Sequence, residues 1–473
     1  WHVLDSAALA EHGSIVAVLE WSMRRSLKDL REDSGYHWLK PPDDATCDAY
    51  AACVRPPVSS RPNRSFHIGA VESELAEATE QQRVVLDVVR LNPRVLMEGP
   101  AGSGKTLLAL EHAATHAGAG CRVLLLCFNR LLMHWLKARV EAALAPEVAA
   151  RVTVTTLHAL MRQVAGLDLS NSPRAGDPGF WSDELPRIAR ERLAGAGPDA
   201  AVHRPDVLVM DEAQDVMWND RFLDFLDAVL KDGLAKGRFL ICGDFACQGI
   251  HKFTPQQGVA FIGRTGATRL RLDWNCRNNR AVGDFACRVM GRRTLYRRYR
   301  RGHHAGDGVV RVLCYADGAQ QFALLEELLE QLAPGGVPTG GERIAVLTAA
   351  RTGSGIAAGL AASSGIWRER LRVLKQKEPF TPEDERNLRR CLGGTWDFIA
   401  HSSAFAFKGL EAHTVIVTDV HPDSFDSAQP SFGRYGDPRA LLFEAATRSL
   451  DRLTILVHDS LHAQVRAWAT AAP

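Results

Sequence analysis

The sequence lacks long apolar runs, paired cysteines and an excess of charge of either sign. None of its apolar stretches approaches the ~20 residues of a membrane-spanning helix, and no signal peptide is visible in the 473 residues. The ten cysteines form no CxxC pair and no cluster with histidine at zinc spacing. The formal net charge is only +2, so any binding to nucleic acid must depend on local basic clusters. We therefore expect a reduced, cytoplasmic protein that does not enter a membrane.

Short apolar runs alternate with helix-like stretches in two successive parts of the chain. Their nearly continuous Val, Leu and Ile content is typical of parallel strands that are buried on both faces. The runs lie at 94–99, 121–128, 151–156, 206–212, 238–244, 308–315, 343–348, 413–420 and 452–457. Two such sets predict an α/β protein with two domains, each a parallel sheet flanked by helices, and a seam near residues 270–280.

The stretch "GPAGSGKT" at 99–106 fits the pattern G-x-x-x-x-G-K-[ST] between an apolar run and a helix-like stretch. Backbone N–H groups of such a loop surround the phosphates of a nucleotide, and the following helix adds its dipole. We expect Lys105 to reach the β- and γ-phosphates and Thr106 to hold Mg²⁺. The predicted nucleotide-binding residues of this loop are Gly99, Gly102, Ser103, Gly104, Lys105 and Thr106.

The stretch "VLVMDEAQD" at 207–215 ends an apolar run in two adjacent acids. Such a run alone is weak evidence, since an ordinary strand end can look the same. After a P-loop, however, Asp211 is expected to bind Mg²⁺ and Glu212 to take a proton from the attacking water.

These motifs, with "FKGLEA" (407–412) and "ATRS" (446–449), resemble those of superfamily 1 helicases of the UvrD/Rep group, in the same order. The resemblance implies RecA-like domains at about 71–272 and 273–473, with ATP in the cleft between them. It also implies movement along single-stranded DNA in the 3′-to-5′ direction. The first-domain insertion, about 160–203, and the interval before "FKGLEA" are short, so the accessory domains are expected to be reduced and strand separation is less secure than ATP hydrolysis.

The same resemblance assigns roles around ATP. Gln82, with Gln81 as the alternative register, would pair with the adenine edge, and Gln214 would face the γ-phosphate. The implied catalytic residues are Lys105, Glu212, Gln248, Arg277 and Arg448. The implied further nucleotide-binding residues are Gln82, Gln214, Asp244, Gly409 and Glu411. The spacing from Asp244 to Gln248 is one residue longer than in the commonest form of that motif, and His251 stands where a stacking aromatic is frequent. In the motif around Lys408, Phe405 stands where the family often has histidine.

Nucleic-acid contacts are implied for Phe128, Asn129, Thr156, His158 and Lys408. From the residues alone, Phe128 is as readily a buried ring and His158 a packed histidine. The segment "GRRTLYRRYRRGHH" at 291–304 is dense in arginine and tyrosine, which favours contact with phosphates and bases over a merely solvated face. Its predicted contacts are Arg292, Arg293, Arg297 and Arg298. A second basic stretch, 367–377, predicts an amphipathic helix.

Residues 1–70 faintly resemble the end of a nuclease-related domain that is sometimes joined to such helicases. Asp5 and Glu20 match its acids, but Ser22 stands where a lysine is needed, so a remnant or an unrelated strand is the favoured interpretation. The prediction is an ATP- and Mg²⁺-dependent DNA helicase or translocase in DNA repair or bacterial antiviral defence, with a possible nuclease or defence partner. The alternative is a nucleic-acid-responsive ATPase switch that regulates a partner protein without strand separation.

Overall fold

The computed structural model describes residues 80–168, 172–195, 204–245, 247, 253–292, 295–301, 310–338, 341–350, 355–363, 365–374, 386–388, 390–391, 396–425 and 438–470. The chain divides into two units, Trp1–Arg64 and Ser65–Pro473, and everything described belongs to the second. The sequence-based assignments to the segment 1–70, to Gln248, to His251 and to Arg293 lie outside the described residues.

The first sheet is built from parallel strands in the order β3-β2-β4-β5-β1-β6. They are β1 (Arg94–Glu98), β2 (Val123–Cys127), β3 (Val152–Thr156), β4 (Val207–Met210), β5 (Arg238–Gly243) and β6 (Thr268–Arg271). Every residue of β2 and β4 is buried, as expected for strands that are covered on both faces. Because the strands are parallel, the loops that follow β1, β4 and β5 meet at one edge of the sheet.

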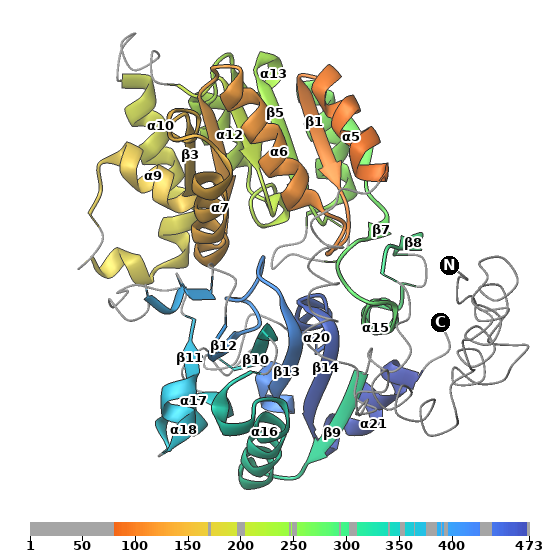
Figure 1. Cartoon of the computed structure of the whole chain (residues 1–473). Helices are drawn as coiled ribbons and strands as arrows, with labels where there is room; N and C mark the ends of the chain where they lie inside the picture. The colour runs from red at the N-terminus through yellow and green to blue at the C-terminus, as the bar shows by residue number, and fades with distance from the viewer. Residues whose placement is uncertain are drawn as a thin grey trace, which may run out of the picture. The chain divides into compact units, whose positions relative to one another are not determined.

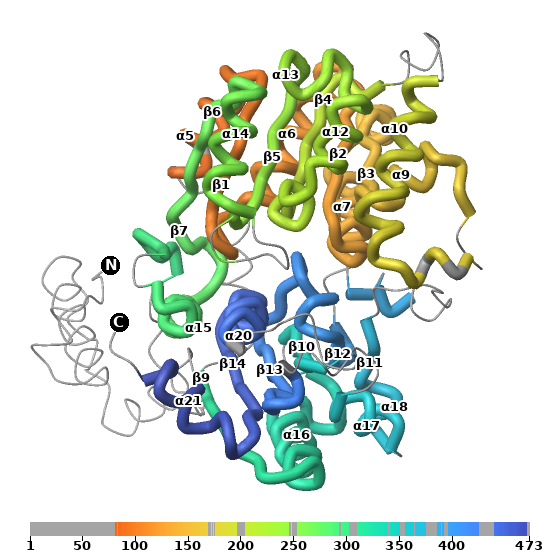
Figure 2. Tube along the Cα trace, turned by 180° about the vertical axis from the view of Figure 1, so that it is seen from behind, coloured from red at the N-terminus to blue at the C-terminus, as the bar shows by residue number. Residues whose placement is uncertain are grey.

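Helices cover both faces of this sheet. One face carries α5 (Glu80–Leu91), α6 (Lys105–Gly118), α7 (Arg130–Ala143) and α8 (Pro146–Ala149), which lie in front in Figure 1. The other carries α9 (Leu157–Ala165), η2 (Phe180–Glu184), α10 (Leu185–Gly195), α12 (Asp220–Val229), α13 (Gly233–Lys236) and α14 (Pro255–Thr265), which Figure 2 shows from behind. The short insertion after α9 therefore adds α10 to the core of this layer.

The second sheet is also parallel, in the order β11-β12-β10-β13-β14-β9. Its strands are β9 (Val310–Tyr315), β10 (Ile344–Thr348), β11 (Leu371–Val373), β12 (Ile399–Ser403), β13 (Ala412–Val420) and β14 (Ser449–His458). One face packs on α16 (Gly318–Leu332), α17 (Ile356–Ala362) and α18 (Ile366–Arg370). The other packs on α15 (Arg280–Val289), α20 (Pro438–Ala446) and α21 (Asp459–Thr470). The predicted α/β architecture of parallel sheets flanked by helices is confirmed.

Three features of the fold differ from, or were missing in, the sequence-based prediction. The strands β6, β11 and β12 were not expected, since β6 is rich in charge and β11 has only three residues. The amphipathic helix expected over 367–377 is wrong, because α18 ends at Arg370 and the chain continues as β11. A short parallel pair, β7 (Trp274–Asn275) with β8 (Arg298–Tyr299), places the basic segment beside the chain that follows β6.

In the part of the chain that the structure describes, no helix combines the length and the apolar character that a membrane crossing requires.

Candidate functional site

The P-loop joins the carboxyl end of β1 to the start of α6. Gly102 and Gly104 have φ angles of 78° and 88°, a region that residues with a Cβ rarely adopt. A Cβ on Gly104 would lie only 1.7 Å from Gln82 Nε2, so the loop and α5 are in close contact. Gln82 is buried and its amide lies 3.4 Å from the carbonyl oxygen of Ser103, whereas Gln81 donates to Asp273 at 2.8 Å. Of the two registers considered, the structure places Gln82 at the loop.

Lys105 points into the concave side of its own loop. Its Nζ donates to the carbonyl oxygens of Gly99 at 2.7 Å and Pro100 at 3.0 Å, and the side chain is buried. Ser103 closes the turn by donating from Oγ to the Pro100 carbonyl at 2.8 Å. A buried ammonium held in this way is a preformed cation for a bound phosphate.

Thr106 and Asp211 meet where the loops after β1 and β4 converge. The Thr106 hydroxyl donates to Asp211 Oδ2 at 2.6 Å, and Asp211 Oδ1 accepts from the backbone N–H of Glu212 at 3.0 Å. Burial, and next the charge of Glu212, raises the pKa of the Asp211 carboxyl. A cation between these oxygens would remove that penalty. Magnesium usually takes one or two protein oxygens together with substrate phosphates, and this pair fits such an ion.

Glu212 adopts φ = 55°, a left-handed conformation that is uncommon outside glycine. Its carboxylate accepts from Gln214 Nε2, and Gln214 Oε1 in turn accepts from the backbone N–H of Asp244 at 3.0 Å. Burial favours a higher pKa for Glu212, but the charges of Lys408, Lys105 and Arg448 together lower it. The carboxylate is therefore held ionised, and Gln214 connects it to the loop after β5.

Lys408 lies in the turn between β12 and β13, yet its ammonium reaches the acids of the first sheet. Nζ lies 2.6 Å from Asp215 Oδ2 and 3.5 Å from Glu212 Oε2, and its side chain is only 4% exposed. Burial favours a lower pKa for Lys408, but Asp215 and Glu212 raise it, so the group stays charged. The nucleic-acid contact expected for Lys408 is not what the structure shows, because this ammonium is committed to two buried carboxylates.

Asn129 makes a second connection to the same turn. Its Oδ1 caps α7 by accepting from the N–H groups of Leu131 and Leu132, and its Nδ2 donates to the Ala406 carbonyl at 3.1 Å. Gly409 completes the contact with φ = 88°, and a Cβ there would lie 2.8 Å from Leu132 Cδ1. Asn129 is buried, so it joins the two sheets instead of facing a nucleic acid.

Phe128, Thr156 and His158 lie at the carboxyl edge of β2 and β3. Thr156 is buried and caps α9 by accepting from the N–H of Ala159 at 3.3 Å. The ring of His158 lies edge-on to those of Phe128 and Trp181, with centroids 5.3 and 5.4 Å away. The two rings pack against each other and against Trp181 of the insertion, but both are only half-buried, so the predicted nucleic-acid contacts of Phe128 and His158 stay predictions.

Arg277 and Arg448 come from the chain that builds the second sheet. Arg277 Nε pairs with Glu411 Oε2 at 2.7 Å. The carboxylate of Glu411, which was expected to bind the ribose, therefore contacts an arginine in this structure. Arg448 is buried and pairs with Glu444 at 2.9 Å. Its charge contributes to the low pKa of Glu212, which places it close to the acids of the first sheet.

The described part of the basic segment contributes both exposed and buried side chains. Arg292, Arg297 and Arg298 are exposed, and the guanidinium of Arg298 lies 5.2 Å from the ring centre of Trp274. Tyr296 is buried and its hydroxyl donates to the P-loop carbonyl of Ala101 at 2.8 Å. The expected base-stacking role therefore does not hold for this tyrosine.

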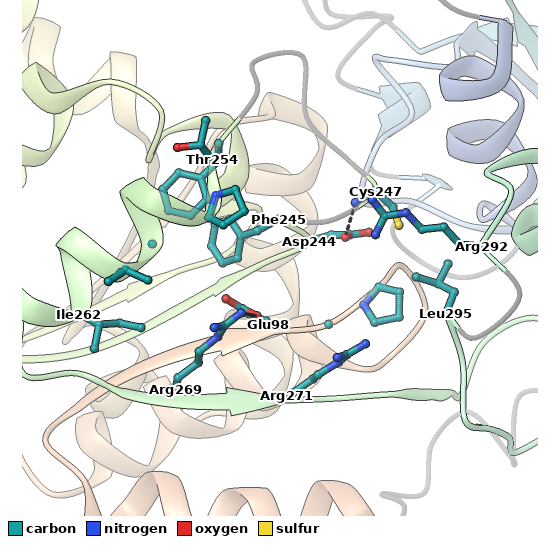
Figure 3. Close-up of a pocket in the computed structure, with 16 residues that line it drawn as sticks. Glu98, Asp244, Phe245, Cys247, Thr254, Ile262, Arg269, Arg271, Arg292 and Leu295 are labelled. Atoms are coloured by element: carbon teal, nitrogen blue, oxygen red, sulfur yellow. Dashed lines mark hydrogen bonds and ion pairs between the residues drawn. The ribbon is translucent and has the colours of Figure 1, made fainter.

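A cavity of about 740 Å³ lies beside the P-loop, between the carboxyl ends of β1 and β5 and helix α14. Figure 3 shows Arg269 and Arg271 projecting into it from β6, with Arg292 on the opposite side. Arg269 pairs with Glu98 at 2.7 Å, and the rings of Phe245 and Phe253 lie 4.8 Å apart in the wall. Guanidinium groups and aromatic rings around one cavity suit an anionic ligand with a planar group.

Sequence reasoning missed several residues that complete this arrangement. Arg301 is fully buried and contacts the carbonyl oxygens of Arg277 and Leu450. The sequence of the segment 291–304 does not show which of its six arginines is buried. The pairing of Arg301 with Asp451 becomes visible only in the fold. Arg269 and Arg271 were missed with their strand, although the alternation "TRLR" is a strand pattern.

Comparison with known proteins adds a fold relationship. No protein-family model matches the chain, and no curated protein matches it. Among solved structures, S. cerevisiae Dbp5 bound to RNA and ADP BeF3 is similar, with a TM-score of 0.51 and 12% sequence identity. The match covers 86% of this chain and 92% of that chain. At this identity the similarity shows the fold: two RecA-like domains, with the P-loop on the first parallel sheet.

Proposed function

We propose that the protein is an ATP-driven motor on single-stranded DNA, a compact cytoplasmic relative of the superfamily 1 helicases of the UvrD/Rep group. The observation that carries this proposal is the junction of the two sheets. One sheet supplies Lys105, the Thr106–Asp211 pair and Glu212, and the chain of the other supplies Arg277 and Arg448. A phosphate-binding loop that faces arginines from a second domain is the arrangement of a nucleotide-driven machine.

The chemistry follows from the positions of these side chains. Lys105 and the glycine loop hold the β- and γ-phosphates, while Thr106 and Asp211 are the residues that hold Mg²⁺, which neutralises phosphate charge. Glu212, kept ionised by Lys408 and Lys105, takes the proton of the attacking water. Arg277 and Arg448 stabilise the charge that develops on the transferred phosphoryl group, a contribution of roughly 10³–10⁵ in rate for an arginine of this kind.

The ion pairs of the two arginines support a coupling between ATP binding and movement of the two sheets. Arg277 pairs with Glu411 and Arg448 with Glu444, so each guanidinium must redirect toward a phosphate when ATP binds. Such an exchange draws the two sheets together, and hydrolysis releases them. Gln214 passes the state of Glu212 to the loop after β5, which forms a wall of the arginine-lined cavity.

The arginine-lined cavity is where we place a nucleotide of the bound strand. Arg271 and Arg292 suit a backbone phosphate, and the ring of Phe253 suits a base. Its position beside the P-loop connects strand binding to the ATP site through Asp244.

ATP hydrolysis with and without single-stranded DNA or RNA tests this proposal. We expect a several-fold increase with single-stranded DNA and loss of activity in Lys105→Ala, while Lys137→Ala, an exposed lysine on α7, leaves the rate unchanged. A rate of ATP hydrolysis that neither single-stranded DNA nor RNA changes would refute the proposal.

A nucleic-acid-responsive switch that regulates a partner protein is the second candidate. It is favoured by the burial of Asn129 and by the edge-on packing of the half-buried rings of Phe128 and His158, since these protein contacts compete with the strand contacts that unwinding would use. Unwinding of a forked DNA by the isolated protein, measured beside its ATPase, would eliminate this candidate. ATPase stimulation without unwinding would favour it.

A further inference from the structure

The segment 295–301 has exposed residues, but part of it packs against the P-loop. Leu295 and Tyr296 are buried in the same apolar cluster as the P-loop residue Ala101 and as Val282 and Phe285 of α15. The Tyr296 hydroxyl donates to the Ala101 carbonyl at 2.8 Å. Burial raises the pKa of this phenol, so it remains a proton donor throughout the physiological range.

The chain from Asn275 to Asn279 contacts the other side of the P-loop. The N–H of Cys276 donates to the Gly102 carbonyl at 2.8 Å, and a Cβ on Gly102 would lie 3.1 Å from Arg277 Cβ. Asn275 Oδ1 accepts from the N–H groups of Arg277 and Asn278, which fixes the turn that carries Arg277. The backbone of this arginine is therefore positioned directly against the phosphate loop.

Arg301 joins this turn to the start of β14, directly after Arg448. Its Nη1 donates to the carbonyl oxygens of Arg277 at 3.0 Å and Leu450 at 2.9 Å, and its Nη2 pairs with Asp451. The side chain is 0% exposed. Taking a guanidinium out of water is unfavourable unless its partners compensate for the lost hydration. A buried arginine that holds two backbone carbonyls is placed to fix geometry.

We infer that Tyr296 and Arg301 are positioning residues for ATP hydrolysis: together they fix the P-loop, Arg277 and the segment of Arg448 relative to one another. Neither side chain needs to touch the nucleotide. Tyr296 acts on the loop through Ala101, and Arg301 acts through the backbone of Arg277 and Leu450. This inference rests on the proposed ATPase function and assigns an inward role to a segment whose neighbouring Arg297 and Arg298 are exposed.

The test compares turnover in Tyr296→Phe and Arg301→Lys, with Tyr315→Phe as the matched control. Tyr315 is also buried and its hydroxyl also approaches a backbone carbonyl, that of Val420, but in the second sheet away from the P-loop. We expect kcat to fall about 3- to 10-fold in Tyr296→Phe, the effect of about one hydrogen bond, and further in Arg301→Lys. KM for ATP should stay within about twofold in all three variants, and kcat should be unchanged in Tyr315→Phe.

Repeating the Arg301→Lys substitution in an Arg277→Ala protein distinguishes a positioning role of Arg301 from a general loss of structure. In Arg277→Ala, one of the two arginines that Arg301 positions is missing, so adding Arg301→Lys should lower kcat by a smaller factor than it does in the wild-type background. Equal factors in the wild-type and Arg277→Ala backgrounds, or unchanged kcat in folded Tyr296→Phe and Arg301→Lys, would overturn the inference. These outcomes differ from failure of the proposed function, in which the wild-type protein itself shows no ATP hydrolysis stimulated by nucleic acid. Tyr296→Phe removes only one hydroxyl group, so it provides the test even where Arg301→Lys does not fold.

Discussion

The buried ion pair between Lys408 and Asp215 gives a quantitative prediction about how the two sheets are held together. Nζ and Oδ2 lie 2.6 Å apart, and the two side chains are 4% and 1% exposed. At an effective dielectric constant of about 20, unit charges at this distance attract by about 6 kcal/mol, most of which offsets the loss of hydration. Removing one partner lowers the free energy of unfolding by more than the small net stabilisation of the pair, because the other charge is left buried without a partner of opposite sign.

We therefore expect Lys408→Met, which keeps the volume and removes the charge, to lower the free energy of unfolding by about 3–5 kcal/mol. Asp215→Asn should cost less, since Glu212 remains 3.5 Å from the ammonium. The double variant should be less destabilised than the sum of the two single changes, with a coupling energy of about 2 kcal/mol.

Urea denaturation of the four proteins measures this coupling energy directly. The exposed pair of Arg187 and Glu191 on α10, with a contact of 2.8 Å and side chains 46% and 59% exposed, is the control. Its coupling should be about 0.5 kcal/mol or less, because water and salt screen it. If Lys408→Met and Asp215→Asn add within about 0.5 kcal/mol, the two side chains do not interact and the junction is wrongly described.

Three further predictions concern the ATP and strand sites. Gln214→Ala should reduce stimulation by single-stranded DNA more than basal hydrolysis, because it cuts the connection between Glu212 and Asp244; an unchanged ratio of the two rates would refute this role. Glu212→Gln should still bind nucleotide, which the fluorescence of a labelled ATP analogue measures, but its kcat should fall at least about 100-fold because the general base is missing. A kcat near that of the wild type would show that another group is the base. Arg271→Ala and Arg292→Ala should each weaken binding to single-stranded DNA and reduce the slope of log K against log salt by about 1, and a slope identical to that of the wild type would remove the cavity from the strand path.

The architecture was readable from the sequence because buried parallel strands are nearly continuous apolar runs. The P-loop and the acids of 207–215 were readable for the same reason, since each follows such a run directly. Strands without that signature were missed. In β6 two of the four residues are arginines, and β11 is too short to stand out beside the basic helix pattern that it interrupts.

The directions of individual side chains were harder to predict, since the same residue type serves outward and inward contacts. Lys408 and Asn129 were expected at a nucleic acid, but each makes a contact across the junction of the two sheets. Of the segment 291–304, a count of charges does not reveal that Tyr296 and Arg301 are buried. Those facts depend on residues far apart in sequence, such as Ala101 and Asp451, which only the fold brings together.

The proposed ATP-driven movement on single-stranded DNA is tested by the rate of ATP hydrolysis of the whole chain, measured with Mg²⁺ in the absence and presence of single-stranded DNA. Hydrolysis should rise several-fold with the DNA and disappear in Lys105→Ala. Hydrolysis that ignores single-stranded DNA and RNA alike, or that persists in Lys105→Ala, would contradict it.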